Sequence, residues 1–264
     1  MIKNNKLGIH SWFGYNYPFE ERIKLIKDTG FQYTMTWWGD EGREKNEPKE
    51  IEPDIVRKHG LIIENTHFSF IGINNIWEDT LDGKEIFNIY LSYIDDCKKH
   101  EIPMAVMHVT NGINPPPYGE LGLNRFKKII EKAEKNNVTI ALENLLRPEY
   151  LDYIFDNIKS DKLKFCYDSG HENCLMSGIK FLEKYKDKLA ALHLHDNNGL
   201  SDQHLLPFSG TINWGDIIDR LKDINYKGVF SLELDAQSNN VVNHYTASDY
   251  LSEAINIAYK LLSM

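Results

Sequence analysis

Short apolar runs rich in β-branched residues alternate along this chain with longer amphipathic stretches, and this alternation restricts the fold more than any other feature. The runs predicted as strands are residues 7–10, 32–37, 61–68, 104–109, 138–144, 163–168, 191–196 and 229–234. The stretches between them have helical periodicity; in residues 126–135, for example, the apolar side chains fall on one face. Strands that alternate with helices form parallel sheets.

The chain length favours closure of this sheet into a barrel. Eight strand–helix repeats within 264 residues match a (β/α)₈ barrel, which takes roughly 250 residues as one domain. We therefore predict an α/β fold, a single TIM barrel over residues 1–264. An open doubly wound sheet is the alternative, but no GxGxxG turn follows the first predicted strand.

Composition argues against several classes of protein. The net charge of −9 gives no general attraction to nucleic acid or to an anionic membrane. The three cysteines, Cys97, Cys166 and Cys174, lack metal-knuckle spacing and fit a reducing cytoplasm better than a disulfide scaffold. The first residues contain no apolar signal core, and no run has the length of a membrane span. We expect a cytoplasmic protein without a membrane or nucleic-acid partner; homo-oligomerisation stays open.

Two long predicted loops interrupt the alternation. Residues 39–53 are charged, and residues 110–122 are rich in proline. Loops of this length in a compact barrel are often lids. A solvated surface loop accounts for each of them equally well.

Histidines and acids gather where the predicted strands end, which is the end that carries the catalytic groups in a TIM barrel. The residues at strand ends are His10, His67, His108, Glu143, Asp168, His193, His195 and Glu233, and His171, Asp202 and His204 follow just beyond. Two other histidines, His59 and His100, fall at predicted helix C-termini, where the helix dipole alone favours an imidazolium. The clustering at one end therefore indicates a site.

The residues two positions before the strand-end acids are small. Ala141, Cys166 and Ser231 each precede an acid by two residues, so each shares its face of the strand. Small side chains beneath acids are expected in a tightly packed layer that faces the inside of a barrel. The alternating leucines then face the helices.

Carboxylates and imidazoles that converge on one mouth repel and desolvate one another unless a cation neutralises them. A single strand-end histidine is more often structural, and a single buried glutamate is usually half of an ion pair, so the inference rests on the set. A divalent metal ion that accepts oxygen and nitrogen ligands (Mn²⁺, Zn²⁺, Mg²⁺ or Co²⁺) would neutralise such a set. A soft thiolate site is not expected, because Cys166 lies below the strand end and Cys174 beyond the loop.

Four segments, 143–150, 166–174, 191–214 and 231–235, resemble the xylose-isomerase-like TIM-barrel superfamily, and the resemblance covers essentially the whole chain. This superfamily contains sugar and sugar-phosphate isomerases and epimerases, and zinc-dependent endonucleases that cut DNA at abasic sites. For the isomerase branch, the resemblance implies one divalent ion held by Glu143, Asp168, His193 and Glu233. The two glutamates would also serve as acid and base.

The endonuclease branch is the alternative that the same resemblance implies. Its three zinc ions have nine ligands, which correspond to His67, His108, Glu143, Asp168, His171, His193, Asp202, His204 and Glu233. All nine positions have the matching residue type. The net acidic loop 39–53 weighs against DNA, however, and the apolar side chains of Phe68, Phe70 and Ile71 have no nearby basic partners in the sequence.

We expect a metal-dependent isomerase or epimerase of a small sugar or sugar derivative, which transfers a proton through a metal-stabilised enediolate. Glu143 and Glu233 are the predicted catalytic groups. The predicted substrate-binding residues are His171, His195, Arg147, Trp12 and His10, with Phe13, Trp37, Trp38 and Phe68 as further aromatic candidates. Arg147 could clamp a phosphate or carboxylate, or pair with a neighbouring acid. A multi-zinc phosphodiester hydrolase is the second hypothesis. A barrel that binds a metabolite without turnover is the least favoured hypothesis. It predicts that some metal ligands are missing, and none is missing here.

Overall fold

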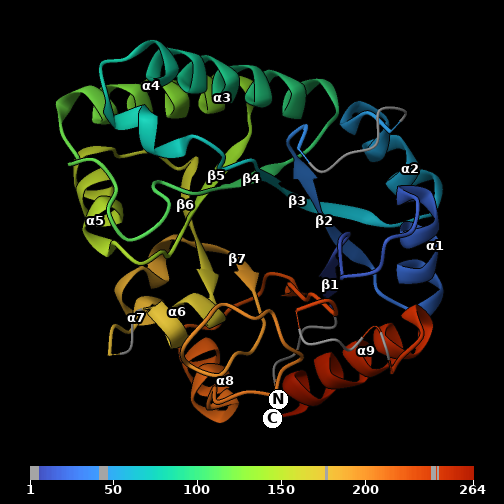
Figure 1. Ribbon diagram of the computed structural model, residues 1–264. Helices are drawn as coiled ribbons and strands as arrows, with labels where there is room; N and C mark the ends of the chain where they lie inside the picture. Colours follow the sequence, from blue (N-terminus) through green and yellow to red (C-terminus); the bar gives the residue numbers. More distant parts are fainter. Residues whose placement is uncertain (1–5, 42–46, 176–177, 239–241, 243) are drawn as a thin grey trace.

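The computed structural model describes residues 6–41, 47–175, 178–238, 242 and 244–264. Its parallel strands form one eight-stranded sheet in the order β7-β6-β5-β4-β3-β2-β1-β8. The strands are β1 (Leu7–His10), β2 (Tyr33–Trp38), β3 (Ile62–Phe68), β4 (Met104–Met107), β5 (Thr139–Glu143), β6 (Leu163–Asp168), β7 (Leu189–His193) and β8 (Phe230–Leu232). Leu194 bridges to Leu232 and brings β7 beside β8. The sheet thus curls into the predicted (β/α)₈ barrel (Figure 1).

Helices follow the strands and form a ring outside the barrel (Figure 1). They are α1 (Phe19–Thr29), α2 (Glu52–Lys58), α3 (Leu81–Lys99), α4 (Glu120–Asn136), α5 (Pro148–Asn157), α6 (Ser169–Leu175), α7 (Phe181–Lys184), α8 (Trp214–Asp223) and α9 (Ala247–Ser263), with short 3₁₀ turns η1 (Lys49–Ile51), η2 (Ile73–Trp77) and η3 (Lys186–Lys188). The apolar face predicted within residues 126–135 is confirmed: Phe126, Ile129 and Ile130 are buried against the core. Among the described residues, no helix is long and apolar enough to cross a membrane.

The two predicted loops are shorter than expected. Residues 42–46 lie outside the described part of the chain, and from Lys49 onward the first loop turns into η1 and then α2. The second loop ends at Gly119, where α4 begins. His171, expected in a loop, lies instead in α6, which starts directly after β6. The differences at η1, α2 and α6 arise because such short helices lack enough apolar residues to show a clear period.

The expected layer of small residues lies inside the barrel. Ala141 and Cys166 pack together with Val106 and Ala191. A shift in the pairing of β2 with β3, between Thr34 and Met35, gives β3 an extra residue at this level. There the buried carboxyl group of Glu64 accepts a hydrogen bond from Ser231 Oγ. Burial raises the pKa of Glu64 to about 7.

Candidate metal and substrate site

Glu143, at the end of β5, lies at the centre of the polar residues in the barrel mouth. Its Oε2 atom is 3.1 Å from His67 Nε2 and 3.0 Å from His108 Nε2. Its Oε1 atom is 2.9 Å from His193 Nδ1. Burial alone would raise the pKa of Glu143, but the charge on His193 and hydrogen bonds from the imidazoles hold it well below its usual range. The carboxylate is therefore ionised at neutral pH.

A second carboxylate, Glu233, approaches His193 from the end of β8. Its Oε2 atom lies 3.2 Å from His193 Nδ1. Burial would raise the pKa of Glu233, but the charge of His193 holds it well below the usual range. One ligand atom from each of Glu143, Asp168, His193 and Glu233 lies within 4.8 Å of the others. The structure thus brings together the four residues that the isomerase-type site requires.

Asp202 links two further histidines beside this group. Its Oδ2 atom is 3.2 Å from His171 Nε2 and 3.1 Å from His204 Nε2. Burial would lower the pKa of His204, but the hydrogen bond with Asp202 and nearby acids raise it to about 10. The additional ligands proposed for a multinuclear site therefore also lie close together: His67 and His108 on Glu143, and His171 and His204 on Asp202.

His195 lies behind Asp168 and holds it in place. His195 Nε2 is 3.1 and 3.0 Å from the two carboxylate oxygens of Asp168, and its ring stacks on His204 at 4.0 Å between centroids. The side chain is fully buried. Because His195 has no open face in this arrangement, its contacts fit the orientation of Asp168 better than contact with a substrate.

The loop after β7 is anchored by Asp196, which the sequence did not single out. Its carboxylate accepts hydrogen bonds from the Trp214 indole at 2.9 Å and from the main-chain N–H groups of Phe208 and Ile212 at 3.0 and 3.1 Å. A buried carboxylate with this many donors fixes the chain around it. The fixed loop carries Asp202 and His204 into the mouth.

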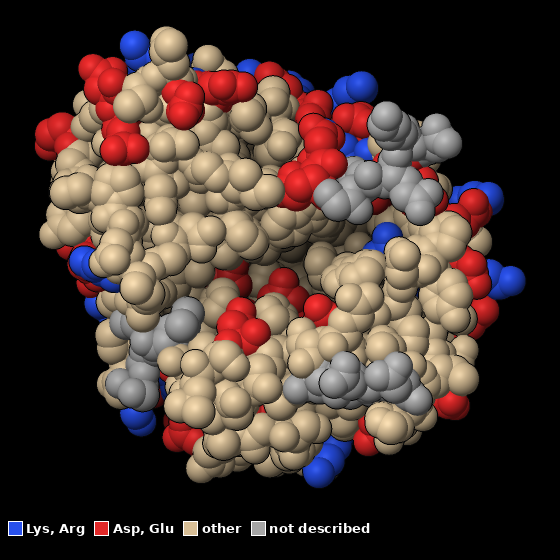
Figure 2. Space-filling view, viewed as in Figure 1, with Lys and Arg blue, Asp and Glu red and all other residues tan. Residues whose placement is uncertain are grey.

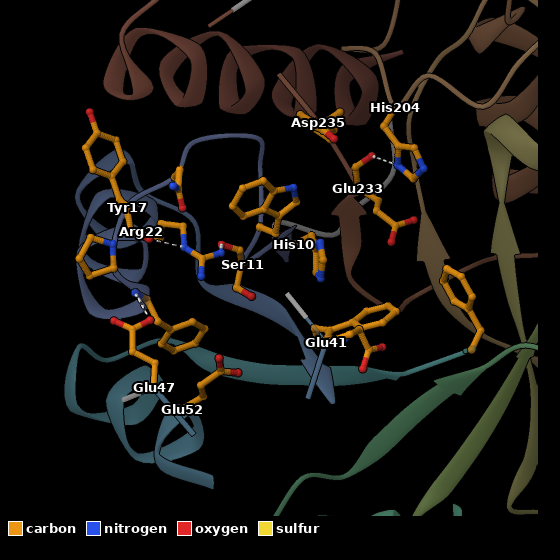
Figure 3. A pocket seen from close by; sticks show the side chains of 17 residues that line it. His10, Ser11, Tyr17, Arg22, Glu41, Glu47, Glu52, His204, Glu233 and Asp235 are labelled. Atoms are coloured by element: carbon orange, nitrogen blue, oxygen red, sulfur yellow. Dashed lines mark hydrogen bonds between the residues drawn. The ribbon is translucent and has the colours of Figure 1, made fainter. Parts of the chain in front are cut away.

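A cavity of about 560 Å³ opens beside Glu233 and His204 (Figure 3). It is lined by His10, Ser11, Trp12, Asn16, Tyr17, Pro18, Phe19, Arg22, Trp37, Glu41, Glu47, Glu52, Phe70, His204, Glu233, Leu234 and Asp235. His10 Nε2 is buried and has no hydrogen-bond partner among the described residues. Burial lowers the pKa of His10 to about 4, so its imidazole is neutral at neutral pH. A neutral imidazole can accept or donate a hydrogen bond to a ligand.

The cavity is acidic. Figure 2 shows acidic side chains at the bottom of the hollow in this face. The carboxylates in the lining are Glu41, Glu47, Glu52, Glu233 and Asp235, whereas Arg22 is the only lysine or arginine among the described lining residues. Arg22 donates hydrogen bonds to the main-chain oxygens of Ser11 at 2.9 Å and Tyr17 at 3.1 Å. Its charge is thus tied to the cavity wall.

Several predicted aromatic and basic residues lie elsewhere. Phe13, Trp38 and Phe68 are fully buried in the hydrophobic core, whereas Trp12 and Trp37 line the cavity. Arg147 is not a lining residue: its Nε atom donates to Glu149 at 2.6 Å, and a second nitrogen donates to the main-chain oxygen of Ile113. Arg147 thus forms the ion pair with a neighbouring acid that was the alternative to a role in clamping a phosphate or carboxylate.

Phe70 lines the cavity although only its apolar character was noted in the sequence. Its ring stacks on His108, with 4.4 Å between centroids and 5° between planes. The signal for this contact was weak, because Phe70 follows the end of β3 and a loop conformation cannot be read from strand alternation. The ring of Trp37 stacks on another histidine of the barrel mouth, His67, with 5.2 Å between the ring centroids.

Comparison with known proteins places this geometry in a family. The sequence profile of the xylose isomerase-like TIM barrel family matches residues 23–258. The chain belongs to this family. A relative from Sinorhizobium fredii, the uncharacterized protein y4fM, is 34% identical over 95% of this chain and 90% of its own length. A D-psicose 3-epimerase from Enterocloster bolteae is 28% identical over 42% of this chain and 38% of its own length.

Solved structures share the fold of this xylose isomerase-like barrel. A D-tagatose 3-epimerase-like protein superposes with a TM-score of 0.73 and 24% identity, over 96% of this chain and 99% of that one. The D-psicose 3-epimerase of Clostridium cellulolyticum H10, crystallised with D-tagatose, gives a TM-score of 0.76 at 16% identity, over 97% and 99% of the two chains. At these identities the likeness shows the fold.

The donor atoms in the mouth suit a divalent metal ion. Three carboxylates and one imidazole, from Glu143, Asp168, Glu233 and His193, form the four-residue group. Hard oxygen donors with one imidazole are ligands that Mn²⁺, Mg²⁺, Co²⁺ and Zn²⁺ accept. The concentration of negative charge in a buried group would be costly without a cation. The residues therefore fit a metal of this class, and the ion's identity is not fixed by them.

Proposed function

We propose that this protein is a metal-dependent isomerase or epimerase of a small sugar that carries no phosphate. The observation that carries the proposal is the pair Glu143 and Glu233, which both contact His193 within one donor group beside the acidic, aromatic cavity. Sugar 3-epimerases among the proteins of similar fold support the reaction class.

Glu143, Asp168, His193 and Glu233 would hold the metal ion. When bound, the ion polarises a substrate carbonyl group and stabilises the negative charge that develops on its oxygen. The protein's own part is to supply the ligands in one compact group and to keep them oriented. His195 contributes by fixing both oxygens of Asp168.

Glu143 and Glu233 would exchange the proton at the carbon next to the carbonyl. One takes a proton from one side of the carbon, and the other delivers to it a proton that it has taken up from solvent. Both carboxyl groups have pKa values well below the usual range, so both are ionised and able to accept a proton in the free protein. Positioned acid–base groups typically contribute roughly 10²- to 10⁴-fold each. His10, which lines the cavity, would orient a substrate hydroxyl group. His171 does not line the cavity, and its two ring nitrogens contact Asn144 O and Asp202.

The cavity favours an uncharged substrate. Its carboxylates would repel a phosphate or an acid, and they are good acceptors for hydroxyl groups. Trp12, Trp37 and Phe70 offer apolar faces against which the carbon-bound hydrogens of a sugar can pack. Glu233 and His204 line the inner end of this space, so a bound sugar reaches the proposed acid–base group.

Solvent-exchange experiments test the proposal. The Mn²⁺-, Co²⁺- or Mg²⁺-loaded protein is incubated in D₂O with free ketoses and, in parallel, with their phosphate esters. We expect deuterium to enter a free ketose at a carbon next to the carbonyl, with a new epimer or isomer. Exchange confined to the phosphate esters would contradict the substrate assignment, and no exchange with any sugar would contradict the reaction class.

A multi-zinc phosphodiester hydrolase is the second candidate, and one observation favours it. His67 and His108 join Glu143 in a ligand group of their own, and Asp202 lies between His171 and His204. Together with the four-residue group, this arrangement could hold three ions. Metal analysis separates the two functions: about one ion per chain is expected for the isomerase, whereas close to three zinc ions with cleavage of abasic-site DNA would establish the hydrolase.

A further inference from the structure

The short helix α6 carries a residue that contacts two acids of the barrel mouth. The main-chain N–H group of His171 donates a hydrogen bond to Asp168 Oδ1 at 2.6 Å. The ring of His171 lies beside the second acid, with 3.2 Å between its Nε2 atom and Asp202 Oδ2. The positions of Asp168 and Asp202 relative to each other therefore depend on where α6 lies.

The first turn of α6 also packs closely on His195. A Cβ atom at Gly170 would lie 1.9 Å from His195 Cε1, so only glycine permits this approach. His195 in turn contacts both carboxylate oxygens of Asp168. A displacement of α6 would thus disturb Asp168 in two ways, through the N–H group of His171 and through the ring of His195.

Helix α6 is too short to keep its place by itself. It has seven residues, and isolated helices shorter than about 12 residues are marginal in water. One of its side chains, Glu172, is held by several donors. Its Oε1 atom accepts hydrogen bonds from the Tyr167 hydroxyl group at 3.0 Å and from Arg220 at 2.6 Å. Its Oε2 atom accepts from the N–H group of Phe181 at 3.0 Å and from Arg220 at 3.2 Å.

Arg220 reaches Glu172 from α8, the helix that also anchors the loop after β7. The two side chains are 8% and 14% exposed, so their bidentate, charge-assisted contact is shielded from water and differs from an exposed ion pair, which contributes little. Trp214, the first residue of α8, donates to Asp196 in the loop that carries Asp202. One helix thus holds both sides of the contact between His171 and Asp202.

We propose that Arg220 is a positioning residue for the mouth. Through Glu172 it fixes α6, and thereby the N–H group and the ring of His171 that contact Asp168 and Asp202. The inference rests on the proposed function only in that it takes Asp168 as a metal ligand. Supporting contacts of this kind keep ligands in the geometry that a metal requires.

The test compares Arg220→Met and Glu172→Gln with two controls, on the full chain. Glu183→Gln removes the other carboxylate that Arg220 binds, which lies on α7 and is 45% exposed. Arg125→Met removes a similarly buried arginine of α4, which donates to the main-chain oxygens of residues 76 and 78. This second control reports the effect of losing a buried arginine far from α6 in the sequence.

Three measurements are made on each variant. Affinity for Mn²⁺ is measured by competition with a chelator. Hydrogen exchange of the His171 amide, relative to the amides of β5, is measured by NMR in the metal-free protein. Urea denaturation gives the free energy of unfolding, so that a local effect on α6 is distinguished from a general loss of stability.

We expect Arg220→Met to weaken Mn²⁺ binding about tenfold, the lower end of the range for residues that support a ligand. The His171 amide should exchange about tenfold faster relative to β5, because α6 opens locally. Glu172→Gln should have the same effects, since its amide group presents donors where acceptors are needed, and it decides the question if Arg220→Met does not fold. Glu183→Gln should remain within about threefold of the wild type in both measurements. Arg125→Met should lose stability but keep both wild-type values.

Wild-type Mn²⁺ affinity and unchanged exchange of the His171 amide in Glu172→Gln would overturn the inference, as would equal losses in the Arg220 and Arg125 variants. The proposed function fails differently. If the wild type binds no divalent ion or catalyses no exchange into a sugar, the enzyme assignment is lost. The amide measurement on the metal-free protein still decides whether Arg220 fixes α6.

Discussion

Two layers of side chains inside the barrel, two residues apart on the same strands, have opposite chemistry. The upper layer, at the strand ends, contains the charged set around Glu143 and His193. The lower layer contains the apolar cluster of Ala141, Cys166 and Ala191. Both layers are buried, so burial alone does not distinguish them. In the upper layer the buried polar groups contact one another, whereas the lower layer is made of small apolar side chains.

The small residues of the lower layer leave room for the polar side chains that lie above them. Short side chains let the carboxylates and imidazoles lie in a compact group over a dense apolar layer. Glu64 is the exception, since the shifted pairing of β3 brings its carboxyl group inside at the lower level beside Ser231. Changes in the upper layer should therefore affect chemistry, and changes in the lower layer should affect stability.

The largest expected effect is on the upper layer. Glu143→Gln keeps the shape of the side chain but removes its charge, which is shared among His67, His108 and His193. We expect the rate of deuterium exchange into the substrate to fall by about 10⁴-fold, the upper end for a single acid–base group, because a metal ligand is weakened as well. Glu149→Gln, at the surface ion pair with Arg147, is the matched control and should retain the wild-type rate.

Replacement of Glu64 should change the pH dependence of stability. Because its pKa is raised to about 7 in the folded protein from 4.5, the folded state binds its proton more tightly than the unfolded state does. The resulting stabilisation is complete below about pH 4.5 and is lost as the pH rises to about 7.

Glu64→Gln removes this loss, because the amide stays neutral. We expect the free energy of unfolding of Glu64→Gln to exceed that of the wild type by about 2–3 kcal/mol at pH 8. At pH 4 the two values should differ little. Chemical denaturation at the two pH values measures this. A wild type that is as stable at pH 8 as Glu64→Gln would show that Glu64 is ionised and satisfied in the barrel.

The smallest expected effect comes from overfilling the lower layer. Ala191→Leu adds volume to a cluster without exposed surface, and overpacking of this kind costs about 1–3 kcal/mol. The midpoint of urea denaturation should fall accordingly, whereas metal affinity of the folded fraction should change by less than about threefold. A loss of affinity with unchanged stability would break the division between the layers.

The sequence was sufficient to predict the barrel and the position of the polar layer, because both depend on local rules. Alternation within a strand places Ala141 beneath Glu143, and strand direction places both at the mouth. The end of the strand that bears Asp168 was predicted to the residue, and the strand that bears Glu143 ends one residue earlier than predicted. The grouping of Glu143, Asp168, His193 and Glu233 came from the family resemblance and agrees with the distances found here.

Other features depend on packing between segments that sequence periodicity does not encode. The register shift that turns Glu64 inward arises from the pairing of two strands. The contact of Phe70 with His108 and the pairing of Arg147 with Glu149 depend on loop conformation. His195 has the same residue type and alternation as His193, yet it lies behind Asp168, because β7 ends at His193 and the chain beyond it follows the loop anchored by Asp196.

The most direct test of the central claim is solvent-deuterium exchange by the protein loaded with a single divalent ion per chain, followed by NMR with a panel of free ketoses. The account predicts incorporation at the carbon next to the carbonyl, with accumulation of the epimer or isomer, and loss of both in Glu143→Gln. Absence of exchange with every free ketose, together with close to three zinc ions per chain and cleavage of abasic-site DNA, would contradict it.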